Sequence, residues 1–368
     1  AVVLSHAHID HSGRLPLLVK RGYSGPIYAH RASCDLARIL LKDSAYLNQR
    51  DVDRDNRHRQ RRGLEPLRPL YSADDAERAC DLLQGQRYAT QVEILPGVEL
   101  TFHDAGHIMG SCSVQLDLTE KQLQRRLVFS GDLGQYDTPI LRDPSPIDSA
   151  DVVLMESTYG GRRHRDREET IAELGEIIQQ AHAQGGNVLI PAFAIGRSQE
   201  ILYHLGTHFD EWELDNWRIF LDSPMAIAAS EVYWDYPHLY DDEATQLHRN
   251  TKEMPPIRNL VLSESADQSR RINEMSRGAI VLAGSGMCTG GRIIHHLKYN
   301  LWRPQAHVII PGYQAQGSLG RRLVERREFV RIHGNPIRVA ANIHTVGGLS
   351  AHGDEQDLSH WYGKIGGR

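Results

Sequence analysis

The sequence has few cysteines and no long apolar segment. Its 368 residues include four cysteines, which lie far apart and form no CxxC pair: Cys34, Cys80, Cys112 and Cys288. This spacing fits neither a zinc ribbon nor a disulfide scaffold, and reduced cysteines are typical of the cytoplasm. No apolar run approaches the roughly 20 residues that span a bilayer. We therefore expect a cytoplasmic protein without membrane contact.

Neither sign of charge dominates the composition. The formal net charge is −5, from 42 basic and 47 acidic residues, which does not mark a nucleic-acid binder. Basic clusters at residues 57–62 and 161–165 are most simply interpreted as solvated loops.

An initiator Met is also missing, and residue 1 already lies in a strand-like apolar run. We therefore expect a chain truncated at both ends, with the first strands and the C-terminal end of one domain missing.

Short apolar runs alternate with segments of helical periodicity along the chain. Strands are expected at residues 1–4, 26–29, 98–104, 126–130, 152–156, 187–191, 218–222, 279–283 and 308–311. Helices are expected at residues 32–42, 73–83, 168–183, 198–207, 226–235, 269–275 and 317–326. The mixture predicts an α/β protein in which helices cover sheets.

Two stretches of this pattern differ from the rest. Strand and helix alternate regularly from Arg162 to Gly334, which predicts a parallel, doubly wound sheet. The segment 51–70 is charged, rich in arginine and weakly periodic. We expect this segment to be a surface excursion.

Four side chains that commonly bind metals lie within six residues near the start of the chain: His6, His8, Asp10 and His11. They follow an apolar run, and such side chains at the end of a buried strand are costly unless something pairs with them. His6 and His8 are two residues apart, so both point the same way from an extended segment. Asp10 and His11 stand where a helix could start, so the two pairs can face neighbouring divalent metals.

Two later residues could complete such a site. His107 is flanked by glycines, and Asp132 follows an expected strand in a Ser-Gly-Asp turn. A carboxylate can bridge two metals because each oxygen can bind one, and histidine ligands suit zinc. Two zinc ions (Zn2+) roughly 3.5–4 Å apart would hold a shared hydroxide and clamp a phosphate.

The motifs HxHxDH, Gly-His and Ser-Gly-Asp, in that order, resemble those of the metallo-β-lactamase fold. This fold is an αββα sandwich with its metals at one edge. The resemblance implies that His6, His8 and His107 hold one zinc ion. It implies that Asp10 and His11 hold the other, and that Asp132 bridges the two.

Four further stretches resemble the β-CASP branch of this superfamily, the nucleic-acid hydrolases. They are residues 155–160, 222–226, 284–292 and 349–354. By this resemblance, Glu156 corresponds to motif A and His352 to motif B. The likeness is greatest to bacterial and archaeal RNA-processing enzymes and to the pre-mRNA 3′-end cleavage endonuclease. It implies a metallo-β-lactamase domain at 1–161, an inserted β-CASP domain at 162–334, and a return to the first domain at 335–368.

The chemistry of phosphodiester cleavage assigns further roles. The leaving oxygen needs a proton, which His352 could supply as general acid if the neighbouring Glu156 favours the imidazolium. Asp10 is a candidate for positioning the nucleophile, which makes it catalytic as well as a ligand. Weaker candidates for contact with substrate phosphates lie in the expected insert: Arg197, Ser285, Gly286 and Arg292.

The function implied by the resemblance is a zinc-dependent ribonuclease with a two-metal hydroxide mechanism, acting internally or, as a close variant, from the 5′ end of RNA. RNA-acting members carry a further His, motif C, downstream of motif B, and His360 does not match it. A DNA nuclease of the same family therefore stays open, as does an inert RNA-binding subunit. The complete ligand set argues against the inert subunit, and the long insert argues against a small-molecule hydrolase. Homodimers are common in the family, so a homodimer also stays open.

Overall fold

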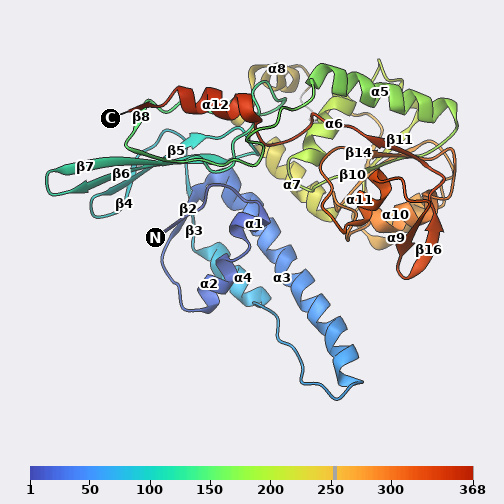
Figure 1. Cartoon of the computed structure of the whole chain (residues 1–368), viewed down its shortest axis with the longest axis horizontal. Helices are drawn as coiled ribbons and strands as arrows, with labels where there is room; N and C mark the ends of the chain where they lie inside the picture. The colour runs from blue at the N-terminus through green and yellow to red at the C-terminus, as the bar shows by residue number, and fades with distance from the viewer. Residues whose placement is uncertain (252–254, 368) are drawn as a thin grey trace. The chain divides into compact units, whose positions relative to one another are not determined.

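The computed structural model describes residues 1–251 and 255–367, which divide into two compact units (Figure 1). Unit 1 consists of residues 1–161 and 352–368, and unit 2 consists of residues 162–351. Unit 1 is therefore built from both ends of the chain. Among the helices of the described residues, none combines the length and apolar character that crossing a bilayer requires.

Unit 1 contains two larger sheets and one short strand pair. A three-stranded parallel sheet has the order β1 (Val2–Val3), β2 (Ile27–His30) and β3 (Leu83–Gln86). A five-stranded sheet has the order β4 (Val92–Leu95), β5 (Val98–Asp104), β6 (Cys112–Glu120), β7 (Leu123–Phe129) and β9 (Val152–Leu154). It is antiparallel except for β9, which is parallel to β7. The short parallel pair is β8 (Ser149–Ala150) with β18 (Gly366–Gly367).

The five-stranded sheet buries apolar residues on both of its faces. Leu100, Phe102 and Val114 pack with residues of the three-stranded sheet. Val128 lies in a separate cluster that includes Trp361, which comes from α12 (Glu355–Gly363). Because successive residues of a strand point to opposite faces, one sheet contributes to both cores.

The other helices of unit 1 include one long helix that runs away from the strands (Figure 1). They are α1 (Ile9–Ser12), α2 (Leu15–Lys20), α3 (Arg31–Gln60) and α4 (Ala73–Asp81). The sequence predicted α3 only as far as residue 42, and the interpretation of residues 57–62 as a solvated loop is wrong as far as Gln60, where α3 ends. Buried residues end at Ala45, so the last turns have no apolar face for periodicity to detect. Ion pairs between neighbouring turns, such as Arg54 with Asp51, are compatible with a solvated helix.

Unit 2 contains a six-stranded sheet in which all strands are parallel. Its order is β12 (Leu260–Leu262), β11 (Arg218–Leu221), β13 (Ala279–Ala283), β10 (Val188–Pro191), β14 (His307–Ile310) and β17 (Asn342–Thr345). Its helices are α5 (Arg167–Ala183), α6 (Arg197–Thr207), α7 (Pro224–Asp235), α8 (Asp242–Thr251), α9 (Ala266–Ile272), α10 (Ile293–Asn300) and α11 (Leu319–Val324). Two 3-10 turns are also present, η1 (Leu214–Asn216) and η2 (Pro237–Leu239).

The two faces of this sheet belong to two separate cores. Val188 and Ile190 pack with residues of α5 and α6, whereas Leu189 between them packs with residues of α10 and α11. A strand buried on both faces is typical of a doubly wound sheet. The prediction of an α/β protein with a parallel sheet in this part of the chain is confirmed.

The segment 335–351 belongs to unit 2, whereas the sequence placed the return to the first domain at residue 335. Here β16 (Asn335–Arg338) pairs with β15 (Phe329–Ile332), and β17 adds to the edge of the parallel sheet. In this division the chain re-enters unit 1 at His352. The polar composition of β17, Asn-Ile-His-Thr, gave no strand signal because an edge strand is only half-buried.

Candidate metal centre

The chain after β1 carries the first histidines into the interior of unit 1. Leu4 donates its N–H to Tyr28 O of β2 at 2.8 Å, and Ser5 O accepts from Cys112 N of β6 at 2.8 Å. The next residue, His6, is fully buried. His8 is the N-cap residue of α1.

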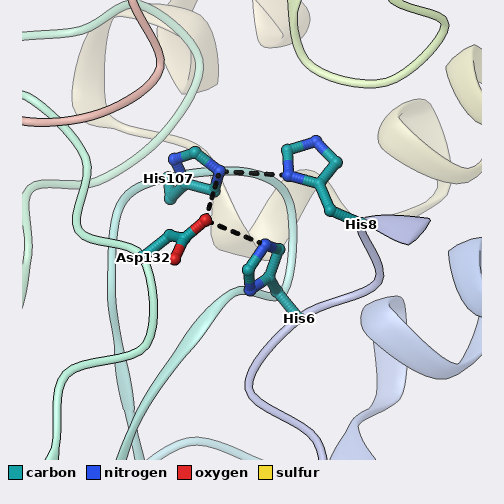
Figure 2. Close-up of side chains that lie close together, drawn as sticks. All are labelled: His6, His8, His107 and Asp132. Carbon is teal, nitrogen blue, oxygen red and sulfur yellow. Dashed lines mark hydrogen bonds and ion pairs between the residues drawn. The ribbon is translucent and has the colours of Figure 1, made fainter. Parts of the chain in front are cut away.

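Two histidines of this segment meet two side chains that are distant in sequence (Figure 2). They are His6, His8, His107 and Asp132, and one potential ligand atom from each lies within 4.8 Å of the others. The rings of the three histidines lie 4.9–5.1 Å apart between centroids. Nδ1 of His8 and Nε2 of His107 are only 3.2 Å apart. Such a set of imidazoles and one carboxylate matches the donor atoms of a zinc site.

The carboxylate of Asp132 is the common point of a larger group. Its Oδ2 atom lies 3.4 Å from Nε2 of His6 and 3.4 Å from Nε2 of His11. The same oxygen lies 3.7 Å from Nε2 of His107 and 4.0 Å from Nε2 of His352. One carboxylate oxygen therefore lies within 4.0 Å of ring nitrogens from four histidines.

Asp10 lies at the edge of this group. Its side chain is 78% exposed, and its Oδ2 atom is 3.7 Å from Nε2 of His11. The structure therefore brings His6, His8, His11, His107 and Asp132 together closely. Of the predicted ligands, Asp10 is the most exposed to solvent.

The protonation of the buried histidines suits metal binding. Burial lowers the pKa of His6 and of His107 well below the ordinary value, and lowers the pKa of His8 to about 4. A neutral imidazole has a lone pair to give to a metal. Nδ1 of His6 lies 3.1 Å from Ser5 Oγ, whereas its Nε2 atom is buried and has no hydrogen-bond partner among the described residues. A buried ring nitrogen without a hydrogen-bond partner, placed among other potential ligands, is well suited to bind a metal.

Asp132 and His11 favour their charged forms. Burial opposes ionisation of Asp132, but the hydrogen bond with His11 and the neighbouring imidazoles bring its pKa well below the ordinary value. The same hydrogen bond raises the pKa of His11, although partial burial acts in the opposite direction. The carboxylate is therefore ionised, as a metal ligand has to be.

Glu156 and His352 form a second group with Asp132. Nδ1 of His352 lies 3.2 Å from Oε1 of Glu156. Burial lowers the pKa of His352, but the hydrogen bond and the charge of Glu156 outweigh it, so the pKa is raised overall. The two residues that the sequence predicted as partners therefore lie in contact, although 196 positions separate them.

Backbone hydrogen bonds hold the loops that carry these residues. Gly134 N donates to Ala105 O at 2.8 Å, and Gly353 N donates to Leu133 O at 2.7 Å. Leu133 N donates to Oε1 of Glu156 at 2.7 Å. The loops after β5, β7 and β9 and the loop before α12 are thereby linked to one another.

Close packing at Gly134 makes this linkage sensitive to side-chain size. A Cβ atom built on Gly134 would lie 1.9 Å from the carbonyl oxygen of Gly106. Gly106 directly precedes His107, and Gly134 follows Asp132 by two positions. Only glycine therefore permits the observed approach of the two ligand-bearing loops.

Serines beside the histidines were not predicted from the sequence. Ser111 Oγ accepts from His107 N at 3.0 Å, and Ser33 Oγ at the start of α3 donates to Gly110 O at 2.6 Å. With Ser5 at Nδ1 of His6, these hydroxyls orient the ligand segments. The position of Ser5 and Ser111 close to a motif histidine could have indicated them from the sequence, because serine hydroxyls commonly bond to nearby backbone groups.

Two of the weaker candidates lie in the glycine-rich loop after β13 in unit 2. Ser285 Oγ accepts from Thr289 N at 3.0 Å and from Gly290 N at 3.3 Å. A Cβ atom on Gly286 would lie 2.9 Å from the ring of Phe193. The Ser285 hydroxyl thus stabilises the turn formed by this loop.

The two arginines among the weaker candidates have acidic partners. Nη1 of Arg197 lies 3.1 Å from a carboxylate oxygen of Glu200. Nη1 of Arg292 donates to Asp222 and to the carbonyl oxygen of Ser263, both at 2.7 Å, and Nη2 donates to the carbonyl oxygen of Glu264 at 2.6 Å. Asp222 is fully buried and also lies 2.6 Å from Nε2 of His296. Arg292 is thus part of a buried network.

Comparison with known proteins gives consistent matches. The model of the Beta-Casp domain matches residues 198–323. Ribonuclease TTHA0252 of Thermus thermophilus is 40% identical over 98% of this chain and 78% of its own length. The RNase J-like protein of Methanocaldococcus jannaschii is 29% identical over 99% of this chain and 78% of its own length. Transcription termination factor FttA of Methanothermobacter thermautotrophicus is 29% identical over 99% of this chain but only 56% of its own length.

Proposed function

Because the chain belongs to the β-CASP family, we propose that it is a metal-dependent ribonuclease that hydrolyses phosphodiester bonds of RNA. The observation that carries the proposal is the carboxylate of Asp132, whose Oδ2 atom lies within 4.0 Å of ring nitrogens from four histidines. Hydrolysis of phosphate esters is typical of such clustered metal ligands. The relative that is 40% identical over 98% of this chain is named a ribonuclease, which supports RNA as the substrate.

We assign two zinc ions to the centre. His6, His8 and His107 would hold one ion, Asp10 and His11 would hold the other, and the carboxylate of Asp132 would contribute to both. When bound, the ions supply Lewis-acid activation of water and stabilise charge on the phosphate. The short separation of the His8 and His107 ring nitrogens, 3.2 Å, supports the first set. The position of His11, 3.4 Å from the same carboxylate oxygen, supports the second.

His352 is the proposed general acid, and Glu156 is its positioning residue. Oε1 of Glu156 accepts from Leu133 N and lies 3.2 Å from Nδ1 of His352, so a backbone contact fixes the carboxylate that faces the ring. This contact directs Nε2 of His352 toward Asp132, at 4.0 Å. A proton on that nitrogen is available to the leaving oxygen of a phosphate held at the centre. Asp10 is exposed beside His11 and is the proposed group for orienting the attacking water.

Contacts to the substrate in unit 2 are proposed at Arg197, Ser285 and Gly286. Glycine-rich loops commonly bind phosphate oxygens through backbone N–H groups. Arg292 is assigned to the same surface, but its side-chain donors already bond to Asp222 and to backbone carbonyls. Its contribution is therefore to hold the loop in position.

Three finer properties accompany this proposal. The mode of action is endonucleolytic, with 5′ exonuclease action as a variant, and labelling either end of the RNA distinguishes the two. The protein is proposed to act in the cytoplasm as a homodimer. Light scattering of the purified protein tests the homodimer, and a measured mass equal to that of one chain would contradict it.

The function is tested by cleavage of one sequence supplied as labelled RNA and as labelled DNA. With zinc, the full protein is expected to cut the RNA and spare the DNA, and a chelator is expected to stop cleavage. Cleavage of DNA alone would establish the DNA-nuclease alternative. Binding of RNA without any cleavage by the zinc-loaded protein would establish the inert subunit instead.

A matched pair of variants assigns the activity to the centre. Asp132→Ala is expected to lose both bound zinc and cleavage, because it removes the carboxylate shared by the cluster. Asp148→Ala removes an exposed carboxylate elsewhere in unit 1 and is expected to retain both. Full activity of Asp132→Ala would contradict the proposed centre.

A further inference from the structure

The C-terminal half of α3 has a stripe of exposed arginines that the proposed centre does not use. Five residues at intervals of four, four, three and four positions form it: Tyr46, Arg50, Arg54, Arg57 and Arg61. At 3.6 residues per turn this spacing places them on one side of the helix, over about 22 Å. All five are exposed, and Tyr46 is 62% exposed. We call this surface the arginine face.

Away from the arginine face, the last turns of α3 are contacted by the segment that follows the helix and runs back from its end (Figure 1). Asn56 exchanges two hydrogen bonds with the backbone of Leu67, at 2.9 and 2.7 Å. Nε of Arg59 donates to Glu65 O at 2.7 Å. Around the helix axis, Asn56 lies about a third of a turn and Arg59 about half a turn from the middle of the arginine face. The returning segment therefore braces the helix from behind and leaves the arginine face open to solvent.

The charge of this region contrasts with that of the whole chain. Residues 50–62 contain six arginines, three aspartates and no lysine, whereas the whole chain has a net charge of −5. Arg54 pairs with Asp51 and Asp55. Among the described residues, Arg57 and Arg61 have no acidic partner. Their guanidinium groups are thus available to an anion from outside.

Tyr46, the aromatic member of the arginine face, also fits a nucleic-acid ligand. The guanidinium carbon of Arg50 lies 6.0 Å from the ring centroid of Tyr46. An exposed aromatic ring beside arginines is a surface on which bases of single-stranded nucleic acid stack, while the arginines bind phosphates. A protein partner rich in acidic residues would satisfy the arginines but gives no role to the exposed ring.

We propose that the arginine face is a second contact surface for single-stranded RNA, separate from the metal centre; this inference rests on the proposed function for its ligand. The first turn of α3 is tied to the loop of His107 through Ser33 and Gly110. Arg61 lies 28 positions beyond Ser33, or about 42 Å along the helix. At ~3.4 Å per nucleotide in a helical strand, this length corresponds to about a dozen nucleotides. Arg50, the nearest arginine of the face, lies 17 positions beyond Ser33, or about 26 Å along the helix, which a hexanucleotide of about 20 Å in a helical strand does not span. Long RNA can therefore reach the arginines as well as the metal centre.

The test compares two variants that lose the same charge. The first is the triple variant Arg50→Gln, Arg57→Gln and Arg61→Gln on the arginine face. The second is the control Arg21→Gln, Arg87→Gln and Arg277→Gln, whose positions are exposed and scattered over both units. Binding of a labelled, phosphorothioate-substituted RNA of 30 nucleotides is measured by fluorescence anisotropy from low to high salt. Cleavage of an unmodified hexanucleotide and of the unmodified longer RNA is measured alongside.

The expected result is weaker binding that depends less on salt. Loss of three phosphate contacts lowers the slope of log affinity against log salt by about 2, at ~0.7 per contact for a single strand, so the affinity gap to the control widens about 100-fold for a tenfold dilution of salt. KM for the long RNA rises, while kcat and cleavage of the hexanucleotide stay unchanged. Separately, Tyr46→Ala is expected to bind at least about 5-fold more weakly, and Tyr46→Phe to bind normally, because stacking is retained.

The outcomes separate this inference from the proposed function. An unchanged salt slope and affinity in the triple variant, relative to the control, would overturn the arginine face as an RNA surface. This holds whether or not the face binds an acidic protein. Failure of the unmodified protein to cleave RNA would overturn the proposed function. In that case a reduced salt slope in the triple variant would still support the contact surface.

Discussion

Replacement of Gly134 by alanine tests how closely the loops of the metal centre have to approach. The new Cβ atom would lie 1.9 Å from the carbonyl oxygen of Gly106, whereas real Cβ contacts essentially never fall below 3.0 Å. The atoms that meet are a backbone oxygen and a backbone-attached carbon, so no side-chain rotation can relieve the contact. The loop of His107 and the loop of Asp132 would have to separate by about 1 Å.

The magnitude of the effect follows from this displacement. Overpacking of a buried site costs about 1–3 kcal/mol of stability. Misplacement of a catalytic group by ~1 Å can reduce the rate about 100-fold. Gly134→Ala is therefore expected to lower zinc affinity, to reduce kcat/KM on RNA about 100-fold, and to leave the protein folded at room temperature.

The assays are zinc titration, RNA cleavage and thermal unfolding of the same preparations. Gly363→Ala at the end of α12 is the matched control, because a Cβ there meets nothing within 4 Å. The control is expected to bind zinc and to cleave RNA like the unmodified protein. Zinc affinity and cleavage at the unmodified level in Gly134→Ala would refute the argument that this approach sets the geometry.

Three further predictions concern single buried groups. Glu156→Gln keeps the shape of the side chain but removes the charge facing His352, so cleavage should slow by at least about 100-fold with zinc content unchanged; loss of zinc in elemental analysis would contradict a positioning role. Asp222→Ala leaves the buried groups that contact this carboxylate, those of Ser269, Arg292 and His296, without their partner. It should lower the free energy of unfolding by about 3–5 kcal/mol in urea titrations; a change below 1 kcal/mol would contradict this. Burial lowers the pKa of His204 to about 4, below its ordinary value of about 6.5 in the unfolded chain. As the pH falls from 6.5 to 4, the unfolded chain therefore binds a proton that the folded protein does not, and the free energy of unfolding decreases by about 3 kcal/mol. His204→Leu should remove this part of the acid sensitivity, whereas His58→Leu at an exposed position should not; equal acid sensitivity in the two variants would count against it.

The first histidines could be predicted from sequence because their arrangement is local. Two residues at alternate positions of an extended segment have to share a side, whatever the rest of the chain does. His107 and Asp132 are different, because no periodicity links them to His6. Their place in the centre was inferred from family resemblance, and the structure brings them within hydrogen-bonding or near-contact distances of the first cluster. The carboxylate–imidazole pair of Glu156 and His352 was predicted on the same basis.

Other parts of the molecule were hidden from sequence reasoning for physical reasons. The last turns of α3 are solvated, so hydrophobic periodicity ends about fifteen residues before the helix does. Strand β17 is polar and lies at a sheet edge, so the sequence pattern gave no signal for the strand that continues unit 2 beyond residue 334. The pairing of Arg292 with Asp222 depends on a turn and a strand end 70 positions apart. Composition and spacing carry no signal for such contacts.

The construction of unit 1 from both ends of the chain has a consequence for biosynthesis. Glu156 leaves the ribosome before unit 2, and His352 leaves after all of residues 162–351 have been made. At ~5–20 residues per second, this interval lasts about 10–40 s. During it the nascent chain carries the aspartate and its neighbouring imidazoles but lacks the proposed proton donor. The proposed catalytic residues are therefore all present only after unit 2 has been synthesised and has had time to fold.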